Sequence, residues 1–440
     1  MEVGRRMTDA RVVLWGRDIA AVTWDDRQES GIFQYAPEFL NSGIEVSPVM
    51  MPLTPEIYQF PTLSRETFKG LPGLLADSLP DKFGNVLINA WLASQGRDAS
   101  SFNPVERLCY IGNRGMGALE FLPTLIGSPT ASRVVEVEEL VKLSNKVLNH
   151  RASLTGKLTG DDDANAIQDV LRVGTSAGGA RAKAILAWNE STGEFRSGQL
   201  DPKEGFTQWL MKFDGIANNR DKELADPQGY GRIEYAYSLM AAEAGINMTR
   251  CRLHEEGGRA HFMTQRFDRT NTGGRLHMQS LCALMHYDFN MSGAHSYEQA
   301  LHAMKLLGLS REEIEQQFRR AAFNVIARNQ DDHVKNIAFL MNRVGQWSLS
   351  PAFDVVYSYN PNGVWTSQHQ MSINGKRDAF EMADLIALAK VGGIKKRKAT
   401  DIVQQVATAI SNWETHGAAA TVPKSTARKI KKTFRLEIDN

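Results

Sequence analysis

The stretch NQDDHVKNIAFL, from Asn329 to Leu340, joins a very polar loop directly to an apolar segment. Its first half gathers amides, two adjacent carboxylates, an imidazole and an ammonium around a single valine. Its second half, IAFL, has the composition of a strand that enters a core. Such a polar cluster is either a solvated turn or a reaction site that the buried strand holds in place.

Length and composition describe an ordinary soluble protein with more than one structural unit. At 440 residues the chain is long enough for two domains, or for one large domain with an appendage. Hydrophobic residues make up 42% and charged residues 23%, as in typical globular proteins. The net charge of +1 excludes polyanion binding through bulk charge, so basic patches have to be sought locally.

The cysteines and the apolar runs indicate the compartment. Cys109, Cys251 and Cys282 are far apart and lack metal-binding spacing, which favours free thiols in a reducing compartment. No apolar run approaches membrane length, and the first residues lack the charged-then-apolar pattern of a signal peptide. We therefore expect a cytoplasmic protein that uses no membrane.

The first part of the chain is predicted to be rich in strands. The run RVVLWGRDIAAVTW, from Arg11 to Trp24, reads as a hairpin around Gly16. A turn is expected to feed a helix near Pro80 and Asp81. A glycine-rich turn then leads into a strand, and a small polar linker is expected over residues 127–132.

Strands and helices are expected to segregate in the rest of the chain. A helix is predicted to end at Gly245, and from about Met278 the pattern becomes mainly helical. Ser310 is the expected N-cap of one of these helices, with Glu313 as its capping-box partner. The runs that fit strands are AKAILAW, FTQWLMKF, RCRLHEE and HFMTQRF. The expected units are residues 8–125, 134–275 and 276–440.

The glycine-rich run GTSAGGARAK, from Gly174 to Lys183, stands directly before a predicted strand. Small residues leave backbone N–H groups open to an anion, so the run is a candidate phosphate loop. It lacks the Gly-Lys-Ser/Thr of a Walker loop, and an ordinary glycine-rich turn has the same composition.

Lys212 lies inside an apolar strand, and Glu234 lies in the helix that follows. A lysine in such a strand either has a charged partner or extends its ammonium to solvent from a half-exposed position. Kinases hold the phosphates of ATP with a strand lysine that pairs with a helix glutamate. An exposed helix glutamate would leave the same sequence signature.

Asp331 and Asn336 are separated by four residues, and Asp354 follows Phe353 in the run LSPAFDVV. Kinase catalytic loops use this spacing, with the Asp accepting a hydroxyl proton and the Asn binding magnesium. Asp354, expected at the end of a short strand downstream of the Asn, stands where the second magnesium ligand belongs. Each residue alone also fits a solvated turn, but the order of glycine-rich loop, strand Lys, helix Glu, Asp-x4-Asn and Asp favours a kinase.

Other chemistries explain fewer of these residues. Asp331, Asp332 and His333 are possible metal ligands of a phosphohydrolase, but that interpretation leaves Lys212 and the glycine-rich run unexplained. Gly174 to Gly178 match Gly-x-Ser-x-Gly, but the run stands before a predicted strand, whereas the elbow of a serine nucleophile follows a strand and opens a helix. It also contains no dinucleotide-binding fingerprint.

The sequence resembles the HipA-type serine/threonine kinases, which are toxins of bacterial toxin–antitoxin pairs. The resemblance covers nearly the whole chain. In the N-terminal part it rests on FQYAPEFL, LPGLLADSLPDKFG and ERLCYIGNRGMGALEF. In the C-terminal part it rests on TSAGGARAK, RFDR, QDDHVKN and SPAFDVV, in the order that the family shows.

The resemblance implies a role for each matched position. Asp331 is the catalytic base, and Asn336 and Asp354 bind Mg²⁺. Lys212 contacts the ATP phosphates with Glu234 as its partner. The further residues implied in nucleotide binding are Gly178, Gly179, Ala180, Arg181, Ala182 and Lys183 of the loop, Gln265, Arg266 and Phe267 of the hinge, and His333, Lys335 and Phe353.

Ser176 matches the serine that the family autophosphorylates. A dianion at that place would repel the ATP phosphates, which is a physical reason for self-inhibition. Three sites depart from the pattern of the best-known member. Asp332 stands in place of a Gly, Gln265 in place of a Glu, and Arg181-Ala182 in place of a Gln-Glu pair. These departures bear on the adenine hinge and on substrate choice.

The resemblance also implies partners. The family works with a small helix-turn-helix antitoxin, HipB, and the pair binds operator DNA as a repressor, so nucleoid association is expected in that complex. Lys376 and Arg377 are the implied DNA-phosphate contacts. The basic runs IKKRK and ARKIKKTFR also fit phosphate contacts, although solvated helix faces look the same. The family's reported protein substrate is an aminoacyl-tRNA synthetase.

The sequence therefore predicts an α+β protein with a kinase-like bilobal core, a β-rich N-terminal subdomain and a mainly helical C-terminal lobe. We expect an ATP- and Mg-dependent protein serine/threonine kinase that is the toxin of a toxin–antitoxin module. A small-molecule kinase and a pseudokinase that acts mainly as a co-repressor are the alternatives. The intact Asp331, Asn336 and Asp354 argue against the pseudokinase.

Overall fold

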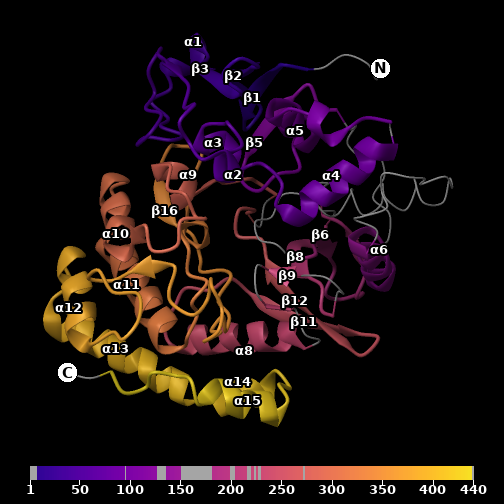
Figure 1. Ribbon diagram of the computed structural model, residues 1–440. Helices are drawn as coiled ribbons and strands as arrows, with labels where there is room; N and C mark the ends of the chain where they lie inside the picture. The colour runs from indigo at the N-terminus through magenta and orange to yellow at the C-terminus, as the bar shows by residue number, and fades with distance from the viewer. Residues whose placement is uncertain are drawn as a thin grey trace.

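The computed structural model describes residues 7–94, 96–125, 135–149, 181–198, 204–215, 220–221, 224–225, 229–270 and 273–438. Figure 1 shows the N-terminal subdomain, drawn in indigo to purple, lying above two lobes. The predicted linker, the predicted autophosphorylation site Ser176, and Gly178, Gly179 and Ala180 of the glycine-rich run lie outside the described residues.

An antiparallel sheet forms the centre of the N-terminal subdomain. Its strands lie in the order β4-β3-β2-β1-β5. They are β1 (Asp9–Leu14), β2 (Arg17–Asp25), β3 (Ser30–Tyr35), β4 (Ile57–Tyr58) and β5 (Leu119–Leu122). The predicted hairpin is confirmed, with β1 and β2 paired around a turn at Trp15 and Gly16. Buried and exposed residues alternate along β2 from Ala20 to Trp24, because one face of this sheet covers a core.

Helices connect this sheet to the rest of the molecule. They are α1 (Pro37–Leu40), α2 (Arg65–Phe68), α3 (Gly73–Ala76), α4 (Lys82–Ser94) and α5 (Pro104–Ile111). The helix predicted after Pro80 and Asp81 is confirmed as α4, and Asp81 Oδ1 accepts a hydrogen bond from Gly84 N at its first turn. A capping box of Asn103 and Glu106 begins α5.

The second unit is a small lobe built on a twisted antiparallel sheet. Its strands lie in the order β11-β12-β8-β6-β7. They are β6 (Lys183–Trp188), β7 (Phe195–Ser197), β8 (Thr207–Lys212), β11 (Cys251–Glu256) and β12 (Arg259–Gln265). The short strands β9 (Arg220–Asp221) and β10 (Leu224–Ala225) pair with each other in a separate sheet. Helices α6 (Val137–Asn149) and α8 (Tyr230–Glu243) accompany the sheet. The strands predicted from the four β-prone runs are thereby confirmed.

The register of the small-lobe sheet places two lysines side by side. Lys183 of β6 is directly opposite Lys212 of β8. Directly opposed residues of antiparallel strands lie on the same face of a sheet, so both ammonium groups leave the sheet in the same direction. Each cation therefore needs its own carboxylate partner.

The third unit is mainly helical. Its helices are α9 (Leu281–Met285), α10 (Tyr297–Leu306), α11 (Arg311–Ile326), α12 (Met382–Val391), α13 (Lys396–Ser411), α14 (Trp413–Ala419) and α15 (Lys424–Lys431). β13 (His277–Ser280), β15 (Ala338–Met341) and β16 (Trp347–Leu349) form one sheet, and β14 (His295–Ser296) pairs with β17 (Met371–Ser372). The predicted capping box of Ser310 and Glu313 is confirmed at the start of α11.

The N-terminal subdomain shares hydrophobic cores with both lobes. One core joins its sheet to the helical lobe, through residues such as Phe33, Leu75 and Phe323. The other joins α4 and α5 to the small-lobe sheet, through residues such as Leu87 and Trp209. The architecture confirms the expected α+β, bilobal arrangement, while the predicted boundaries remain a prediction. No helix among the described residues is long and apolar enough to cross a membrane.

Candidate active site

A cavity of about 210 Å³ lies where the three units meet. It brings together most of the residues singled out by the sequence. Its lining consists of Asp77, Ser78, Leu79, Asp81, Lys82 and Met116 from the N-terminal subdomain, Leu210, Lys212, Glu234, Met248, Cys251, Phe262, Thr264, Gln265, Arg266 and Phe267 from the small lobe, and Met278, Ser280, Phe289, Asp331, His333, Lys335, Asn336, Phe353, Asp354, Val355 and Trp365 from the helical lobe.

Lys212 is the electrostatic centre of the cavity. Its Nζ lies 2.6 Å from Glu234 Oε1 of α8, and it also contacts the Asp354 carboxylate of the helical lobe. Glu234 is 1% exposed, so it is a buried partner and not a solvated helix residue. Burial alone would lower the pKa of Lys212, but the two carboxylates raise it above its ordinary value, so the ammonium stays charged.

Asp354 is held in an unusual backbone conformation. The residue has φ of +55°, in the left-handed region that few non-glycine residues adopt. Strand β16 ends at Leu349, and Asp354 follows in a bend, whereas the sequence placed it at the end of a short strand. Burial would raise the pKa of the Asp354 carboxyl, but Lys212 lowers it to about 2. The carboxylate is therefore ionised at neutral pH.

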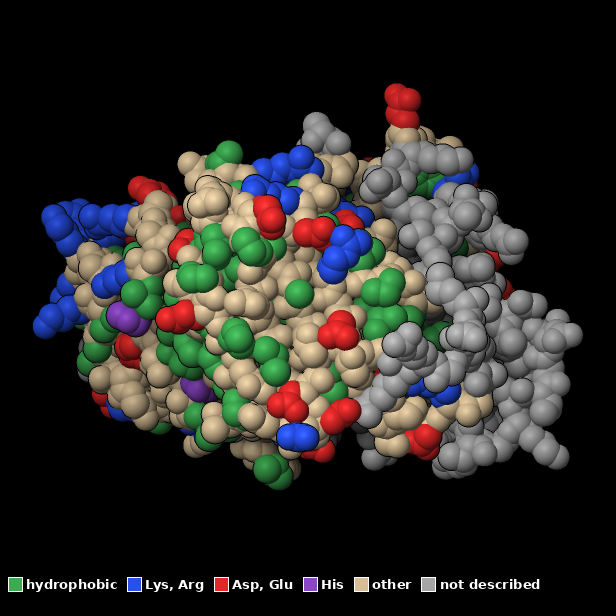
Figure 2. All heavy atoms as spheres, turned by 90° about the horizontal axis from the view of Figure 1, so that it is seen from above, with side chains coloured by type: hydrophobic (Ala, Val, Ile, Leu, Met, Phe, Trp, Pro, Cys, Tyr) green, Lys and Arg blue, Asp and Glu red, His purple; other side chains and the backbone are tan. Residues whose placement is uncertain are grey.

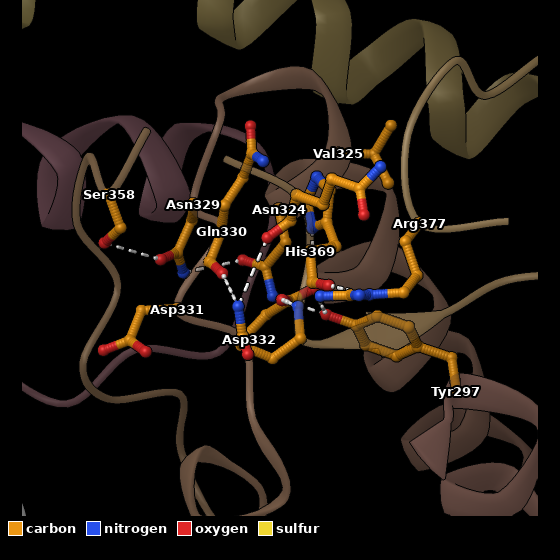
Figure 3. Close-up of polar contacts among 12 residues, drawn as sticks. Tyr297, Asn324, Val325, Asn329, Gln330, Asp331, Asp332, Ser358, His369 and Arg377 are labelled. Atoms are coloured by element: carbon orange, nitrogen blue, oxygen red, sulfur yellow. Dashed lines mark hydrogen bonds and ion pairs between the residues drawn. The ribbon is translucent and has the colours of Figure 1, made fainter. Parts of the chain in front are cut away.

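The two adjacent carboxylates of the opening stretch turn in different directions, as Figure 3 shows. Asp331 reaches the cavity, where its Oδ1 accepts a hydrogen bond of 2.7 Å from the indole nitrogen of Trp365. Asp332 turns into the protein and is 3% exposed. The loop that carries both leads into η2 (Val334–Asn336) and β15, so the buried strand holds the loop as the sequence pattern predicts.

Asp332 is fixed by three hydrogen bonds. Its Oδ2 accepts from Tyr297 Oη at 2.8 Å and from His369 Nδ1 at 2.8 Å, and its Oδ1 accepts from Gln370 N at 2.7 Å. Burial would raise the pKa of Asp332, but His369 and these donors lower it. Asp332, for which the sequence offered no role, is the anchor of the loop.

His369 links this anchor to the end of the chain. Its Nδ1 faces the Asp332 carboxylate, which only accepts, and its Nε2 lies 3.3 Å from Arg435 Nη1, which only donates. The contacts therefore fit an imidazole that donates from Nδ1 to Asp332 and accepts at Nε2. Arg435 also donates to Val325 O of α11. A residue that follows α15 thus connects His369, the partner of Asp332, to this helix.

Asn336 and Asp354 have the donor atoms that a hard cation requires. Asn336 Nδ2 donates to Asp331 O at 2.8 Å, so the amide oxygen is the part of this side chain that can coordinate a cation. Both residues line the cavity, and Asp354 is ionised. Carboxylate and amide oxygens are the ligands that Mg²⁺ prefers, so these residues fit a magnesium site.

The metal-dependent phosphohydrolase interpretation does not fit this geometry. It requires Asp331, Asp332 and His333 to share one ion, but the Asp332 carboxylate is buried among donors on the other side of the loop. Within the ranges that the structure describes, no group of three or more His, Cys, Asp or Glu side chains is arranged to hold a metal ion.

The hinge residues Gln265, Arg266 and Phe267 all line the cavity, but their side chains make different contacts. Gln265 ends β12, and the rings of Phe267 and Phe353 lie 5.5 Å apart, which forms an aromatic wall. The Arg266 guanidinium turns to Asp268, with contacts of 2.9 and 2.6 Å. Asp268 also accepts from Gly117 N at 2.6 Å. Arg266 thus ties the hinge to the N-terminal subdomain.

The described end of the glycine-rich run borders the site. Arg181 stacks 3.6 Å from the centre of the Tyr230 ring, and Ala182 is fully buried in a hydrophobic core. Lys183 Nζ lies 2.9 Å from Asp81 Oδ2, and both side chains are about 5% exposed. None of the three loop residues is in the lining of this cavity.

Sequence reasoning missed two residues of the site. Asp81 was interpreted only as part of a turn before a helix, although it pairs with Lys183 and lines the cavity. The available signal was its position in LPGLLADSLPDKFG, one of the runs on which the family resemblance rests. Trp365 has no local signal, because the segment around it contains no regular structure.

The imidazole of His333 and the ammonium of Lys335 both lie against the ring of Phe289 at the cavity wall.

The predicted DNA contacts lie away from the cavity. Lys376 Nζ lies 2.9 Å from Asp384 and 3.3 Å from Glu381, and Arg377 Nε donates to His369 O. In Figure 2, the densest group of blue side chains lies at one edge, on the side where Figure 1 places α10 and α12. Lys395 to Lys398, at the start of α13, are all exposed. DNA contact by any of these residues remains a prediction.

Comparison with solved structures identifies the fold. HipA of the Shewanella oneidensis MR-1 toxin–antitoxin system, solved with HipB and operator DNA, matches over 96% of this chain and 95% of that chain, with a TM-score of 0.66 and 18% identity. The Helicobacter pylori proinflammatory kinase CtkA matches 51% of this chain and 92% of that chain, with a TM-score of 0.30 and 12% identity. No curated protein matches the sequence.

Family models cover most of the chain. The HipA N-terminal domain matches residues 10–122, which include the N-terminal sheet. The HipA-like C-terminal domain matches residues 175–413, which is more than half of the 440 residues and includes the cavity residues of both lobes. The chain belongs to the HipA family, and its fold is the kinase-like bilobal fold of that family.

Proposed function

We propose that this protein is a kinase that transfers the γ-phosphate of ATP, with magnesium, to a serine or threonine hydroxyl of a protein. One observation carries the proposal. The buried Lys212–Glu234 pair, Asp331, Asn336 and Asp354 come from separate segments of the chain and meet in one cavity. Phosphoryl transfer needs this combination of a phosphate-binding cation, a base and cation ligands.

Each side chain has a role in the transfer. Asp331 accepts the proton of the substrate hydroxyl, whose oxygen forms a bond to the γ-phosphorus while the bond to the β–γ bridging oxygen breaks and ADP leaves. Lys212, oriented by Glu234, binds the phosphates of the nucleotide. Asn336 and Asp354 would hold Mg²⁺, which neutralises phosphate charge when bound. The Phe267–Phe353 wall offers an apolar surface for the adenine ring.

The resemblance to the family extends the proposal to regulation and partners. We propose that Ser176 accepts a phosphate from the protein itself, which would add a dianion to the run that the resemblance assigns to nucleotide binding. A Ser176→Ala protein is expected to lose label from the corresponding tryptic peptide. A HipB-like antitoxin and operator DNA are the proposed partners, because the Shewanella structure with the same fold contains both.

The test is to incubate the pure protein with γ-labelled ATP, with and without magnesium. Asp354→Asn is the matched variant, since it removes the negative charge of one cation ligand and keeps the shape of the side chain. Label on wild-type protein or on an added protein, dependent on magnesium and lost in the variant, supports a protein kinase. Label transferred only to added small molecules would indicate a small-molecule kinase. ATP binding without any transfer would indicate a pseudokinase that acts as a co-repressor.

A further inference from the structure

Trp365 contacts the proposed base directly. Its Nε1 donates to Asp331 Oδ1 at 2.7 Å, and its side chain lines the cavity. His333 Nε2 lies 3.9 Å from the same oxygen, which is beyond hydrogen-bond range, so the histidine does not take the place of the indole. The contact joins two residues that are 34 positions apart in the sequence.

The segment that carries Trp365 is tied to the catalytic loop at a second place. His369 Nδ1 and Gln370 N bind the two oxygens of Asp332 at 2.8 and 2.7 Å. The Gln370 side-chain amide also contacts Trp365 O. Asp331 and Asp332 therefore hold one segment at two points, and the buried Asp332 contacts fix the position from which the indole reaches Asp331.

We propose that Trp365 is a positioning residue for Asp331 in phosphoryl transfer, an inference that rests on the proposed kinase function. A hydrogen bond to Oδ1 fixes the rotation of the carboxylate, so that the base faces the acceptor hydroxyl. The donor is also neutral. A cation in the same place would bind the carboxylate more strongly but would reduce its affinity for the proton that it must accept. An indole N–H also orients the base, and because it is neutral it reduces that proton affinity less than a cation would.

The surroundings of Trp365 agree with a site at which the acceptor arrives. The neighbouring residue Val364 is 96% exposed, so the segment reaches the surface next to the indole. On the cavity side, Phe289 and His333 complete the wall near Asp331. An acceptor hydroxyl that approaches Asp331 therefore passes beside the indole.

The test compares Trp365→Phe with wild-type protein in a single-turnover assay with saturating γ-labelled ATP and magnesium. Phenylalanine keeps an aromatic ring and removes only the donor. We expect the transfer rate to fall about 10- to 100-fold, because a misplaced reacting group has an effect of that order. The dissociation constant for ADP with magnesium is expected to change less than about twofold, because the proposal assigns Trp365 to the base and not to the nucleotide.

Two controls separate positioning from a general structural role. Trp347→Phe removes another half-buried indole N–H, which donates to Glu45 O outside the cavity, and is expected to leave the rate unchanged. In an Asp331→Asn background, Trp365→Phe is expected to have no further effect on the residual rate, since the indole acts through that carboxylate. A purely structural role would give the same relative loss in both backgrounds.

The outcomes are distinguishable from failure of the proposed function. If wild-type protein binds nucleotide but transfers no phosphate, the kinase proposal fails and this inference fails with it. If wild-type protein transfers phosphate and Trp365→Phe does so at the same rate, only the positioning role is overturned. An additive loss in the Asp331→Asn background would also overturn it.

Discussion

Lys212 shows at the residue scale how the site balances its charges. One ammonium faces two carboxylates, Glu234 from its own lobe and Asp354 from the other. The lysine therefore connects the two lobes, and in the proposed function it also offers a cation to the phosphates. Any change that removes the ammonium leaves two like charges together in a buried place, where mutual repulsion is poorly screened.

Lys212→Met is predicted to weaken both stability and nucleotide binding. Breaking a buried ion pair by removing one partner costs about 3–5 kcal/mol of unfolding free energy. The pKa of Asp354, now about 2, is expected to rise because its cation is gone. Denaturant unfolding and ADP titration calorimetry measure the two effects. Glu234→Gln, which keeps the Lys212–Asp354 contact, is the control and is expected to lose less unfolding free energy. Equal stability of Lys212→Met and wild type would contradict the role of the lysine.

Acidification is predicted to destabilise the protein through Asp268 and Asp332. Burial would raise the pKa of each carboxyl, but Arg266 and Arg269 around Asp268, and His369 beside Asp332, lower it. Because each pKa is lower in the folded state than in the unfolded state, the stabilisation is present above about pH 4 and is lost as the pH falls further. Unfolding free energies measured between pH 6 and 3 are expected to decrease. The difference between wild type and Asp268→Asn is expected to shrink over the same range.

The sequence identified Asp331 but not the role of Asp332, for a physical reason. A spacing of four residues to Asn336 is a local property, and it marks Asp331 as the candidate base. The partners of Asp332 on Tyr297 and His369 lie 35 and 37 positions away. Contacts at such separations are set by the tertiary fold, and no local pattern contains them.

At the scale of elements, helix α8 and strand β12 approach each other very closely. A Cβ atom on Gly231 of α8 would lie 2.1 Å from Ala260 O of β12. Glu234 stands one turn further along the same helix, so the glycine sets the distance between the helix that carries the glutamate and the sheet that carries Lys212. The close approach is a requirement of the site and not only of packing.

Gly231→Ala is predicted to destabilise the protein, although alanine is the better helix former by about 1 kcal/mol. The methyl group would push α8 away from β12 and lengthen the Lys212–Glu234 contact. Gly417 of α14 is a matched control, because its added Cβ would meet atoms only at ordinary distances of 3.8 Å or more. We expect Gly417→Ala to stabilise by up to about 1 kcal/mol, as measured by denaturant unfolding. Stabilisation by both substitutions would disprove the close-approach argument.

The elements themselves were largely predictable, because their signals are local. Ser310 and Glu313 define the start of α11 through their own side chains, and the alternation along β2 follows from a half-buried sheet. The expected strand end at Asp354 is wrong, since the residue lies in a bend with φ of +55°, a conformation that no local sequence pattern indicates. The segment that carries Trp365 lacks periodicity, so its contact with Asp331 appears only in the folded structure.

At the scale of the whole molecule, Asp81 and Lys183 connect the N-terminal subdomain to the small lobe. Their ion pair is buried, and burial raises the pKa of Asp81 even though Lys183 opposes the shift. We expect the pair to contribute specificity of docking more than net stability. The family resemblance predicted the order of the units, but not that the N-terminal subdomain would contribute a carboxylate to the cavity wall.

A double-variant cycle tests this connection. Asp81→Asn removes one partner of this buried ion pair and is expected to lower the unfolding free energy by about 3–5 kcal/mol. Adding Lys183→Met is expected to restore stability to within about 1 kcal/mol of wild type, since a neutral pair carries no uncompensated charge. Denaturant unfolding of the singles and the double gives the coupling energy. Additive losses in the double variant would show that the two side chains do not interact.

In the proposed phosphotransfer site, Asp331 is the base and its neighbour Asp332 is the anchor of the loop. The most direct measurement is the single-turnover rate of γ-phosphate transfer by Asp331→Asn, with its unfolding free energy measured beside that of Asp332→Asn. We predict that Asp331→Asn is as stable as wild type and transfers phosphate about 10²- to 10⁴-fold more slowly. Asp332→Asn is expected to lose about 1–3 kcal/mol of stability. Transfer by a folded Asp331→Asn protein at the wild-type rate would show that Asp331 is not the base.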